Sequence, residues 1–291
     1  MVSPFRFAVN MLTPGTGPEW RARCRRAEEL GYDLILVADH LGMPAPFPSL
    51  VAAAAATTRP RLGTFVLNTG FWNPALLARE VATTAALTDG RLELGLGTGY
   101  VRAEHERAGI PFLPPGERVG HLARTVEELA GTLKGEEGGP RTPLLIGGNG
   151  ERVLRLAARH ADVTAFSGGR FTGEGVTVLT AEELAGRVES YRGFEREAGR
   201  TTPAELNLLV QRVIVTEDRP AAAAEFLPLA PYLDEELILD LPILLIGTVP
   251  EIADRVKALR ERFGFSYLTV LDRAMEAFGP VIARLRGSAP S

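Results

Sequence analysis

Asp39 and His40 are the two adjacent residues with the clearest chemical potential in this sequence. They follow a short apolar run, residues 34–38, of the kind that forms a buried strand. An imidazole at a strand end can exchange protons near neutral pH, and the carboxylate beside it can accept a hydrogen bond from a cofactor. A structural alternative stays open, in which His40 caps the following turn and Asp39 pairs with an arginine.

Other polar residues occur where further predicted strands end. They are Asn10 after the first strand, Asn68 and Thr69 after the third, and Thr98, Gly99 and Tyr100 after the fourth. Phe71 and Trp72 come next to the third strand, where their rings can line a pocket or pack in the core. Because parallel barrel strands present their carboxyl ends at one mouth, we expect these residues to lie around a common site.

A glycine-rich turn, Gly-Gly-Asn-Gly at residues 147–150, leads into a predicted helix over residues 151–161. Backbone N–H groups at the positive end of a helix can bind phosphate, and glycine lets the backbone approach closely. An ordinary tight turn between a strand and a helix explains the same residues. The sequence therefore indicates either a phosphate site or a purely structural turn at residues 147–150.

A second glycine cluster, Gly95, Gly97 and Gly99, does not fit the dinucleotide fingerprint. Tyr100 stands beyond it, and prolines interrupt the stretch that should form the crossover helix. We therefore expect no nicotinamide-binding Rossmann domain.

Short apolar runs alternate with longer helical patterns along the whole chain. The predicted strands cover residues 5–10, 34–38, 62–67, 92–97, 144–147, 163–166, 206–215 and 267–271. The predicted helices cover residues 19–30, 49–56, 74–87, 117–133, 151–161, 181–198 and 274–286, with further helical material before residue 262. Eight β/α units favour an α/β fold closed into a (β/α)8 TIM barrel, because closure removes both exposed edges. We expect one domain, residues 1–291, with the glycine-rich stretch 168–180 as an insertion loop at the C-terminal mouth.

The composition argues against several classes of protein. The formal net charge is −4 and the basic residues are dispersed, so no nucleic-acid partner is expected. Cys24 is the only cysteine, which excludes an internal disulfide and is typical of a reducing cytosol. Without a signal-peptide pattern or an apolar run long enough to cross a bilayer, we expect a cytoplasmic protein that does not associate with membranes.

The histidines other than His40 give no metal-binding pattern. Neither an H-x-x-x-H nor an HExxH spacing occurs. His105, His121 and His160 fall in predicted helices with charged neighbours, where solvent-facing or helix-end positions are expected. The sequence predicts no metal site.

Four segments together resemble the luciferase-like monooxygenase superfamily, in its branch of F420-dependent oxidoreductases. They are ADH at 38–40, NPALLAREVATTAALTDGRLELGLGTG at 73–99, LLIGGNGERVLRLAARHAD at 144–162 and LIGTVPEIADRVKALRERFGFSYLTV at 245–270. The resemblance covers nearly the full length of the chain. It implies a barrel whose C-terminal mouth holds a flavin or deazaflavin ring against the third strand, and it implies a homodimer.

The same resemblance assigns roles to individual residues. Asp39 matches the position that contacts the deazaflavin ring, and His40 matches the proposed catalytic histidine of F420-dependent members. A non-prolyl cis peptide that supports the cofactor is placed at Thr64 and Phe65. Thr98 and Gly99 match a cofactor contact on the fourth strand, and Gly147, Gly148 and Asn149 match a phosphate-binding turn.

Tyr100 departs from one group within the family. Some sugar-phosphate dehydrogenases carry a catalytic glutamate at this position, so the resemblance argues against that substrate class. The resemblance, together with the residues at the strand ends, therefore implies hydride transfer between coenzyme F420 and a small organic substrate, with His40 or Tyr100 handling the proton. The alternatives are an FMN-dependent luciferase-like monooxygenase and a non-catalytic barrel that binds a cofactor or a partner.

Overall fold

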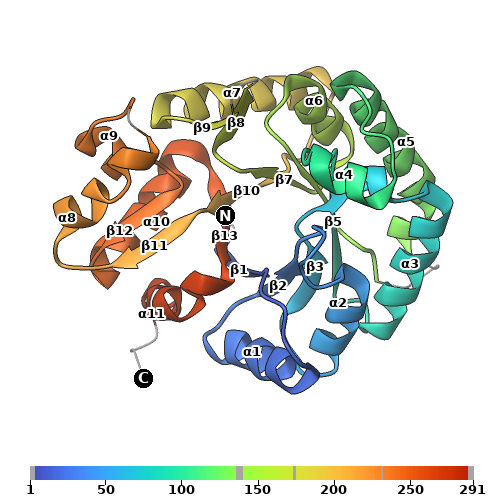
Figure 1. Ribbon diagram of the computed structural model, residues 1–291, viewed down its shortest axis with the longest axis horizontal. Coiled ribbons are helices and arrows are strands. Elements are labelled where there is room, and N and C mark those ends of the chain that lie inside the picture. Colours follow the sequence, from blue (N-terminus) through green and yellow to red (C-terminus); the bar gives the residue numbers. More distant parts are fainter. Residues whose placement is uncertain (1–3, 136–139, 173–174, 231, 288–291) are drawn as a thin grey trace.

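Eight parallel strands close into a barrel surrounded by helices (Figure 1). The computed structural model describes residues 4–135, 140–172, 175–230 and 232–287. The barrel strands are β1 (Arg6–Met11), β2 (Leu34–Val37), β3 (Arg61–Thr64), β5 (Leu92–Gly97), β6 (Leu144–Gly147), β7 (Val163–Phe166), β10 (Glu205–Val210) and β13 (Phe265–Leu271). Each pairs with its neighbours in parallel, and the β3–β5 pairing completes the ring. The predicted (β/α)8 barrel is confirmed, while its extent as one domain over residues 1–291 stays a prediction.

The helices follow the strands and surround the barrel, except that α4 lies at one end of it (Figure 1). They are α1 (Gly17–Glu29), α2 (Pro46–Ala54), α3 (Pro74–Leu87), α4 (Arg102–Ala108), α5 (Pro115–Lys134), α6 (Glu151–His160), α7 (Ala181–Glu197), α8 (Arg219–Ala224), α9 (Glu235–Asp240), α10 (Val249–Phe263) and α11 (Met275–Leu285). Local chemistry sets their starts: the Asn73 side chain accepts hydrogen bonds from the backbone of Ala75 and Leu76, with Pro74 as the first helical residue.

Two apolar layers hold the barrel together. Alternate residues of β1, such as Phe7 and Val9, point outward into the large core between the strands and the helices. The residues between them face the barrel axis, where Ala8 joins a small inner cluster with Leu36 and Tyr267. Charged residues fill the N-terminal end of the axis, where Arg6 contacts Glu93 and Glu205 at 2.5 Å each.

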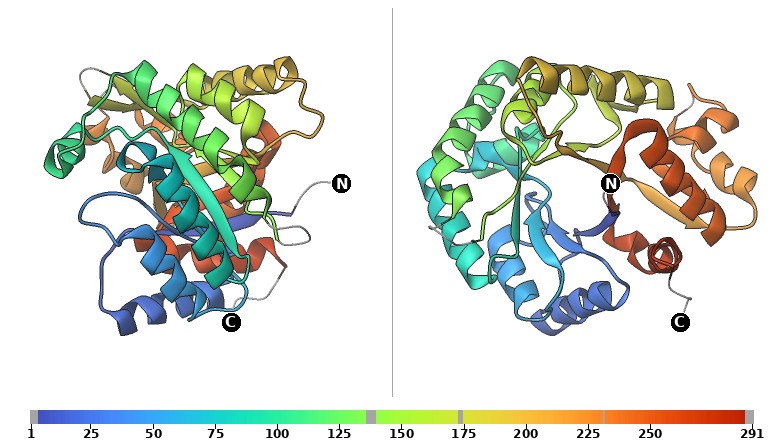
Figure 2. Two further views of the ribbon diagram at one scale, coloured as in Figure 1. Left: turned by 90° about the vertical axis from the view of Figure 1, so that its right-hand side faces the viewer. Right: turned by 180° about the vertical axis from the view of Figure 1, so that it is seen from behind.

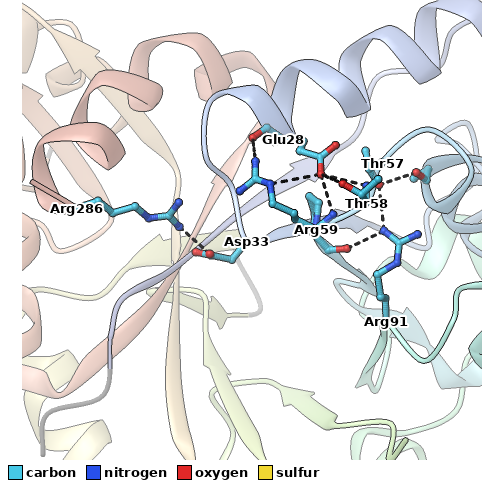
Figure 3. A network of polar contacts seen from close by, with 9 residues as sticks. Glu28, Asp33, Thr57, Thr58, Arg59, Arg91 and Arg286 are labelled. Carbon is cyan, nitrogen blue, oxygen red and sulfur yellow. Dashed lines mark hydrogen bonds and ion pairs between the residues drawn. The ribbon is translucent and has the colours of Figure 1, made fainter. Parts of the chain in front are cut away.

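Polar contacts fasten the loops at the N-terminal end of the barrel (Figure 3). The Glu28 carboxylate accepts hydrogen bonds from the backbone of Thr58 and Arg59, just before β3. The guanidinium of Arg91, just before β5, donates to the carbonyl of Pro60. In barrels of this type, contacts at the N-terminal end contribute to stability, and the functional residues lie at the opposite, C-terminal end.

The third barrel strand is interrupted. Strand β3 ends at Thr64, a cis peptide bond joins Phe65 to Val66, and the short strand β4 (Leu67–Asn68) continues alongside β5. The predicted position of the cis bond, Thr64–Phe65, is therefore wrong by one residue. Thr64 is still part of the sheet, where it pairs with Val37 of β2, so the irregular backbone begins one residue later.

Two further differences from the sequence predictions lie outside the eight-stranded ring. The stretch 168–180, expected to be a loop, contains the antiparallel strands β8 (Gly169–Thr172) and β9 (Gly175–Val178), at the same end of the barrel as α4 (Figure 2, left). The predicted strand 206–215 divides at Gln211 into β10 and β11 (Arg212–Val215). Strand β11 leaves the barrel to pair with β12 (Leu244–Gly247), which falls in a region predicted to be helical.

No described helix is long and apolar enough to cross a membrane.

Candidate functional site

His40 and Glu104 form a close pair at the C-terminal mouth of the barrel. Nδ1 of His40, just after β2, lies 3.0 Å from each carboxylate oxygen of Glu104 on α4. Both side chains are largely shielded, with 26% and 16% of their surface exposed. The sequence analysis missed Glu104, because nothing in its local pattern distinguishes it from the other charged residues of a helix.

Asp39, the residue before His40, is held by two donors. Its Oδ2 accepts a hydrogen bond from the indole Nε1 of Trp72 at 2.9 Å and one from the backbone N–H of Asn68 at 3.2 Å. Burial raises the pKa of Asp39, and these two hydrogen bonds offset part of that effect. The alternative in which Asp39 pairs with an arginine finds no support, since no such ion pair occurs within the described residues.

Trp72 packs edge to face on Phe47, with ring centroids 5.3 Å apart. Trp72 is partly buried against the core and also donates to Asp39, so the structure is compatible with packing and with lining the site.

His105 lies in the last turn of α4, so of the two expected positions, solvent-facing or helix-end, the helix-end one is found, and the side chain is buried. Only 1% of it is exposed, its Nε2 lies 3.0 Å from Nδ2 of Asn68, and its ring contacts Phe71 and Phe112. Since Oδ1 of Asn68 already accepts the N–H of Gly70, the amide donates and Nε2 of His105 accepts. This contact anchors α4 to the end of β4, and periodicity in so short a helix gave no sign of it.

Thr98, Gly99 and Tyr100 continue the mouth beyond β5. The carbonyl of Gly99 accepts a hydrogen bond from the guanidinium of Arg118. Tyr100 is 55% exposed, and its ring meets the His40 ring edge to face at a centroid distance of 5.7 Å. The pKa of Tyr100 is raised, mainly because its hydroxyl is partly shielded from water and to a smaller extent because the Glu104 carboxylate is nearby.

A cavity of about 130 Å³ adjoins these residues. Its lining includes Gly70, Thr98, His105, Arg118 and His121. His121 is half-buried, and its Nε2 lies 3.0 Å from the carbonyl of Thr69, so its ring forms part of the wall of this cavity. Thr98 therefore lines a pocket beside the mouth.

The interruption of the third strand forms the floor of the site. Phe65 and Val66 are partly buried against the inner cluster of the barrel, and Nδ2 of Asn10 lies 3.5 Å from the carbonyl of Phe65. The other amide atom of Asn10, Oδ1, is buried and has no hydrogen-bond partner among the described residues. A polar atom in this position is suited to a ligand that supplies a hydrogen-bond donor.

The turn after β6 has the features of an anion cradle. Gly150 precedes α6 without a side-chain cap, so the first backbone N–H groups of α6 have no partner within the helix. A Cβ atom placed on Gly150 would meet nothing within 4 Å, so open space lies beside these groups. These residues fit a phosphate group.

The three residues predicted to bind phosphate serve different purposes in this turn. The N–H of Gly148 donates to the carbonyl of Ala165, and Gly147 packs closely on Val66. The amide of Asn149 donates to Ser167 and to the carbonyl of Gly169, and these bonds hold the loop after β7. The turn is therefore positioned by Gly147, Gly148 and Asn149, while the free N–H groups come from the start of α6.

The fold places most of the predicted site residues at one mouth of the barrel: Asp39, His40, Thr98, Gly99 and Tyr100. The interruption at Phe65 and the turn at residues 147–150 lie at the same end. The side chain of Thr64 lies in the strand, where its hydroxyl bonds Gly95. Within the described residues, no group of three or more His, Cys, Asp or Glu side chains could hold a metal ion.

Comparison with known proteins identifies the family. Residues 1–240 match the family model of the luciferase-like monooxygenases, and the chain belongs to that family. An F420-dependent glucose-6-phosphate dehydrogenase of Beutenbergia cavernae is 30% identical over 226 residues, which cover 68% of this chain and 64% of the relative. The chain spans less than two thirds of the length of the curated relatives that it matches first.

Two solved structures share the fold. An F420-dependent secondary alcohol dehydrogenase in complex with an F420–acetone adduct has a TM-score of 0.76 at 16% identity, over 97% of this chain and 98% of the other. The oxygenating constituent of 3,6-diketocamphane monooxygenase from Pseudomonas putida, in complex with FMN, has a TM-score of 0.72 at 16% identity, over 97% and 96%. At such identities the likeness establishes the barrel and leaves the cofactor to other arguments.

Proposed function

We propose that this protein is an oxidoreductase that transfers a hydride between coenzyme F420 and a small organic substrate. The observation that carries the proposal is the His40–Glu104 pair at the mouth, next to Asp39 and above the interrupted third strand. A proton-exchanging imidazole is needed where hydride transfer creates or consumes a hydroxyl group. The similarity to F420-dependent relatives supports the choice of cofactor.

Several residues would hold the cofactor. The floor formed by Phe65 and Val66 would support the ring, with Asp39, Thr98 and Gly99 at its edges, and the start of α6 would bind its phosphate. The unpartnered Oδ1 of Asn10 suits a donor on the ring. When bound, the deazaflavin supplies hydride chemistry, and the chain supplies orientation and electrostatics.

His40 is the residue we propose to hold the substrate proton. Tyr100 is the less suitable base, because burial and the Glu104 carboxylate raise the pKa of its hydroxyl and keep it protonated at neutral pH. It can still contact the substrate, since more than half of its surface is exposed.

An FMN-dependent monooxygenase is the second candidate, because a structural neighbour binds FMN on the same fold. In that reaction the reduced flavin reacts with oxygen, so oxygen uptake separates the two candidates. A non-catalytic barrel is the third, and it would bind a cofactor or a partner without turnover.

Titration of the purified protein with F420 and, separately, with FMN tests the proposal through ligand fluorescence. Micromolar or tighter binding of F420 alone supports it, preference for FMN together with oxygen uptake supports the monooxygenase, and binding of neither overturns both. Gly150→Asp places a carboxylate at the start of α6, and we expect it to weaken F420 binding by about 10-fold or more through charge repulsion at a helix N-terminus.

Gly186→Asp is the matched control for this variant. Gly186 lies exposed on α7, and a Cβ there also meets nothing within 4 Å. An equal loss of affinity in both variants would contradict the assignment of the phosphate site to the turn at residues 147–150.

A further inference from the structure

Glu104 reaches His40 from a different element of the fold. His40 follows β2, whereas Glu104 lies in the first turn of α4, which belongs to the connection after β5. Both carboxylate oxygens lie 3.0 Å from the same atom, Nδ1, so the contact directs the Nδ1 side of the imidazole toward Glu104.

The chemistry of a carboxylate determines which nitrogen of His40 carries the hydrogen. An ionised carboxylate has only acceptor atoms, so Nδ1 of His40 must donate to it. In the neutral ring the other nitrogen, Nε2, then has a free lone pair. Among the described residues no hydrogen bond to Nε2 occurs, so this atom is available to a ligand.

We propose that Glu104 is the positioning residue of this site: it holds His40 in its Nδ1–H form and makes Nε2 the atom that takes and returns the substrate proton. The identity of that proton rests on the proposed function, whereas the positioning does not. A carboxylate in this place also stabilises the positive charge that develops when Nε2 takes the proton.

The next residue in the chain keeps Glu104 in place. His105 is buried, bonded to Asn68 and packed against Phe71 and Phe112, while Gly109 ends the helix in a left-handed conformation with φ +68°. A seven-residue helix is too short to be stable alone, so this anchor determines where Glu104 points. His105 faces Asn68 and the two phenylalanine rings, and Glu104 faces His40.

The first test measures the tautomer of His40 directly by ¹⁵N NMR of the histidine side chains in the protein without cofactor, at a pH where the ring is neutral. His40→Gln identifies the signal. We expect the Nδ1–H form in the wild type and in Glu104→Gln, whose amide oxygen still accepts, and loss of that preference in Glu104→Ala. Glu106→Ala, an exposed glutamate on the same helix, is the control and should leave the signal unchanged. An Nε2–H form in the wild type, or no change in Glu104→Ala, overturns the proposal.

The second test measures turnover. We expect Glu104→Ala to lower kcat by about 10- to 100-fold with little change in KM or in the Kd of the cofactor, because the imidazole remains but is no longer held. Added formate should restore part of the activity of Glu104→Ala, because formate can replace the missing carboxylate. It should restore none of the activity of His40→Ala, which lacks the imidazole. Unchanged kcat in Glu104→Ala, or a lack of rescue with a proportionate rise in KM, overturns the catalytic part. The NMR test uses no cofactor, so failure of F420 binding would overturn the proposed function and leave the positioning role of Glu104 intact.

Discussion

The hydroxyl of Thr64 bonds both backbone groups of Gly95. Oγ1 accepts the N–H of Gly95 and donates to its carbonyl, each at 2.8 Å. A Cβ added to Gly95 would lie 2.0 Å from the carbonyl oxygen of Thr64. On Gly97 it would lie 2.7 Å from the side chain of Val66, and on Gly99 it would lie 2.1 Å from the side chain of Asn68. Gly95 and Gly97 of the fourth barrel strand, and Gly99 just after it, are therefore the positions at which the chain passes the interrupted third strand.

Gly95→Ala should destabilise the protein severely. The added carbon meets backbone, which cannot move aside as a side chain can, so we expect a loss of about 3 kcal/mol or more, at the high end for overpacking a core. Urea unfolding followed by circular dichroism measures it. Gly131→Ala, on α5 with nothing within 4 Å, is the control and should be neutral or stabilising. Equal stability of the two variants would contradict the close approach.

Thr64→Val tests the hydroxyl of the same contact. The methyl group keeps the volume and removes the hydrogen bonds, so the buried N–H of Gly95 loses its partner at a cost of about 1–3 kcal/mol. Thr64→Ser keeps the hydroxyl and should lose less. If Val and Ser variants unfold at the same urea concentration, the hydroxyl does not support this junction.

The barrel could be predicted from the sequence because its strands are apolar runs with a regular spacing. Strands β5, β6 and β7 and helix α3 have the predicted bounds. The interruption after Thr64 could not be placed correctly, since it depends on contacts with β5, and the division of residues 206–215 at Gln211 depends on pairing with β12, about 30 residues further along the chain. Such long-range pairings leave little trace in local periodicity.

The candidate site was predictable in part for the same reason. Residues at the carboxyl ends of strands, such as His40 and Asp39, follow from the fold. Glu104 and His105 lie on a connecting helix, and only the folded chain shows that the first faces His40 and the second Asn68.

Tyr100→Phe should retain most of the turnover. The raised pKa of Tyr100 keeps its hydroxyl protonated through neutral pH, so the residue is a poor base, and the phenyl ring can still pack against His40. We expect kcat to fall less than about 10-fold, against about 10²- to 10⁴-fold for loss of the proposed acid–base group in His40→Ala. Steady-state kinetics with bound cofactor measures both. A greater loss of kcat in Tyr100→Phe than in His40→Ala would show that Tyr100, and not His40, handles the proton.

Asp39→Asn should change the pH dependence of stability. Burial raises the pKa of Asp39, so the folded protein holds this proton more tightly than the unfolded chain and its stability falls as the pH rises through the interval above the ordinary value near 3.8. The asparagine oxygen can still accept from Trp72 and Asn68. We therefore expect the difference in Tm, variant minus wild type, to be larger at pH 7 than near pH 4. Differential scanning fluorimetry of both proteins at both pH values measures it. A difference in Tm that grows toward acid would contradict this sign.

Arg6→Met tests whether the charges at the N-terminal end of the axis act on stability alone. The Glu93 side chain is 2% exposed, and its carboxylate would be left without its 2.5 Å partner. Breaking a buried pair from one side costs about 3–5 kcal/mol, so the urea midpoint should fall strongly. Adding Glu93→Gln removes the stranded charge and should recover part of the loss. Arg79→Met, at an exposed pair with Glu80, should change stability by less than about 1 kcal/mol. Because this end lies opposite to His40, the folded fraction of Arg6→Met should bind cofactor with wild-type affinity, and weakened binding there would mean that the two ends of the barrel are coupled.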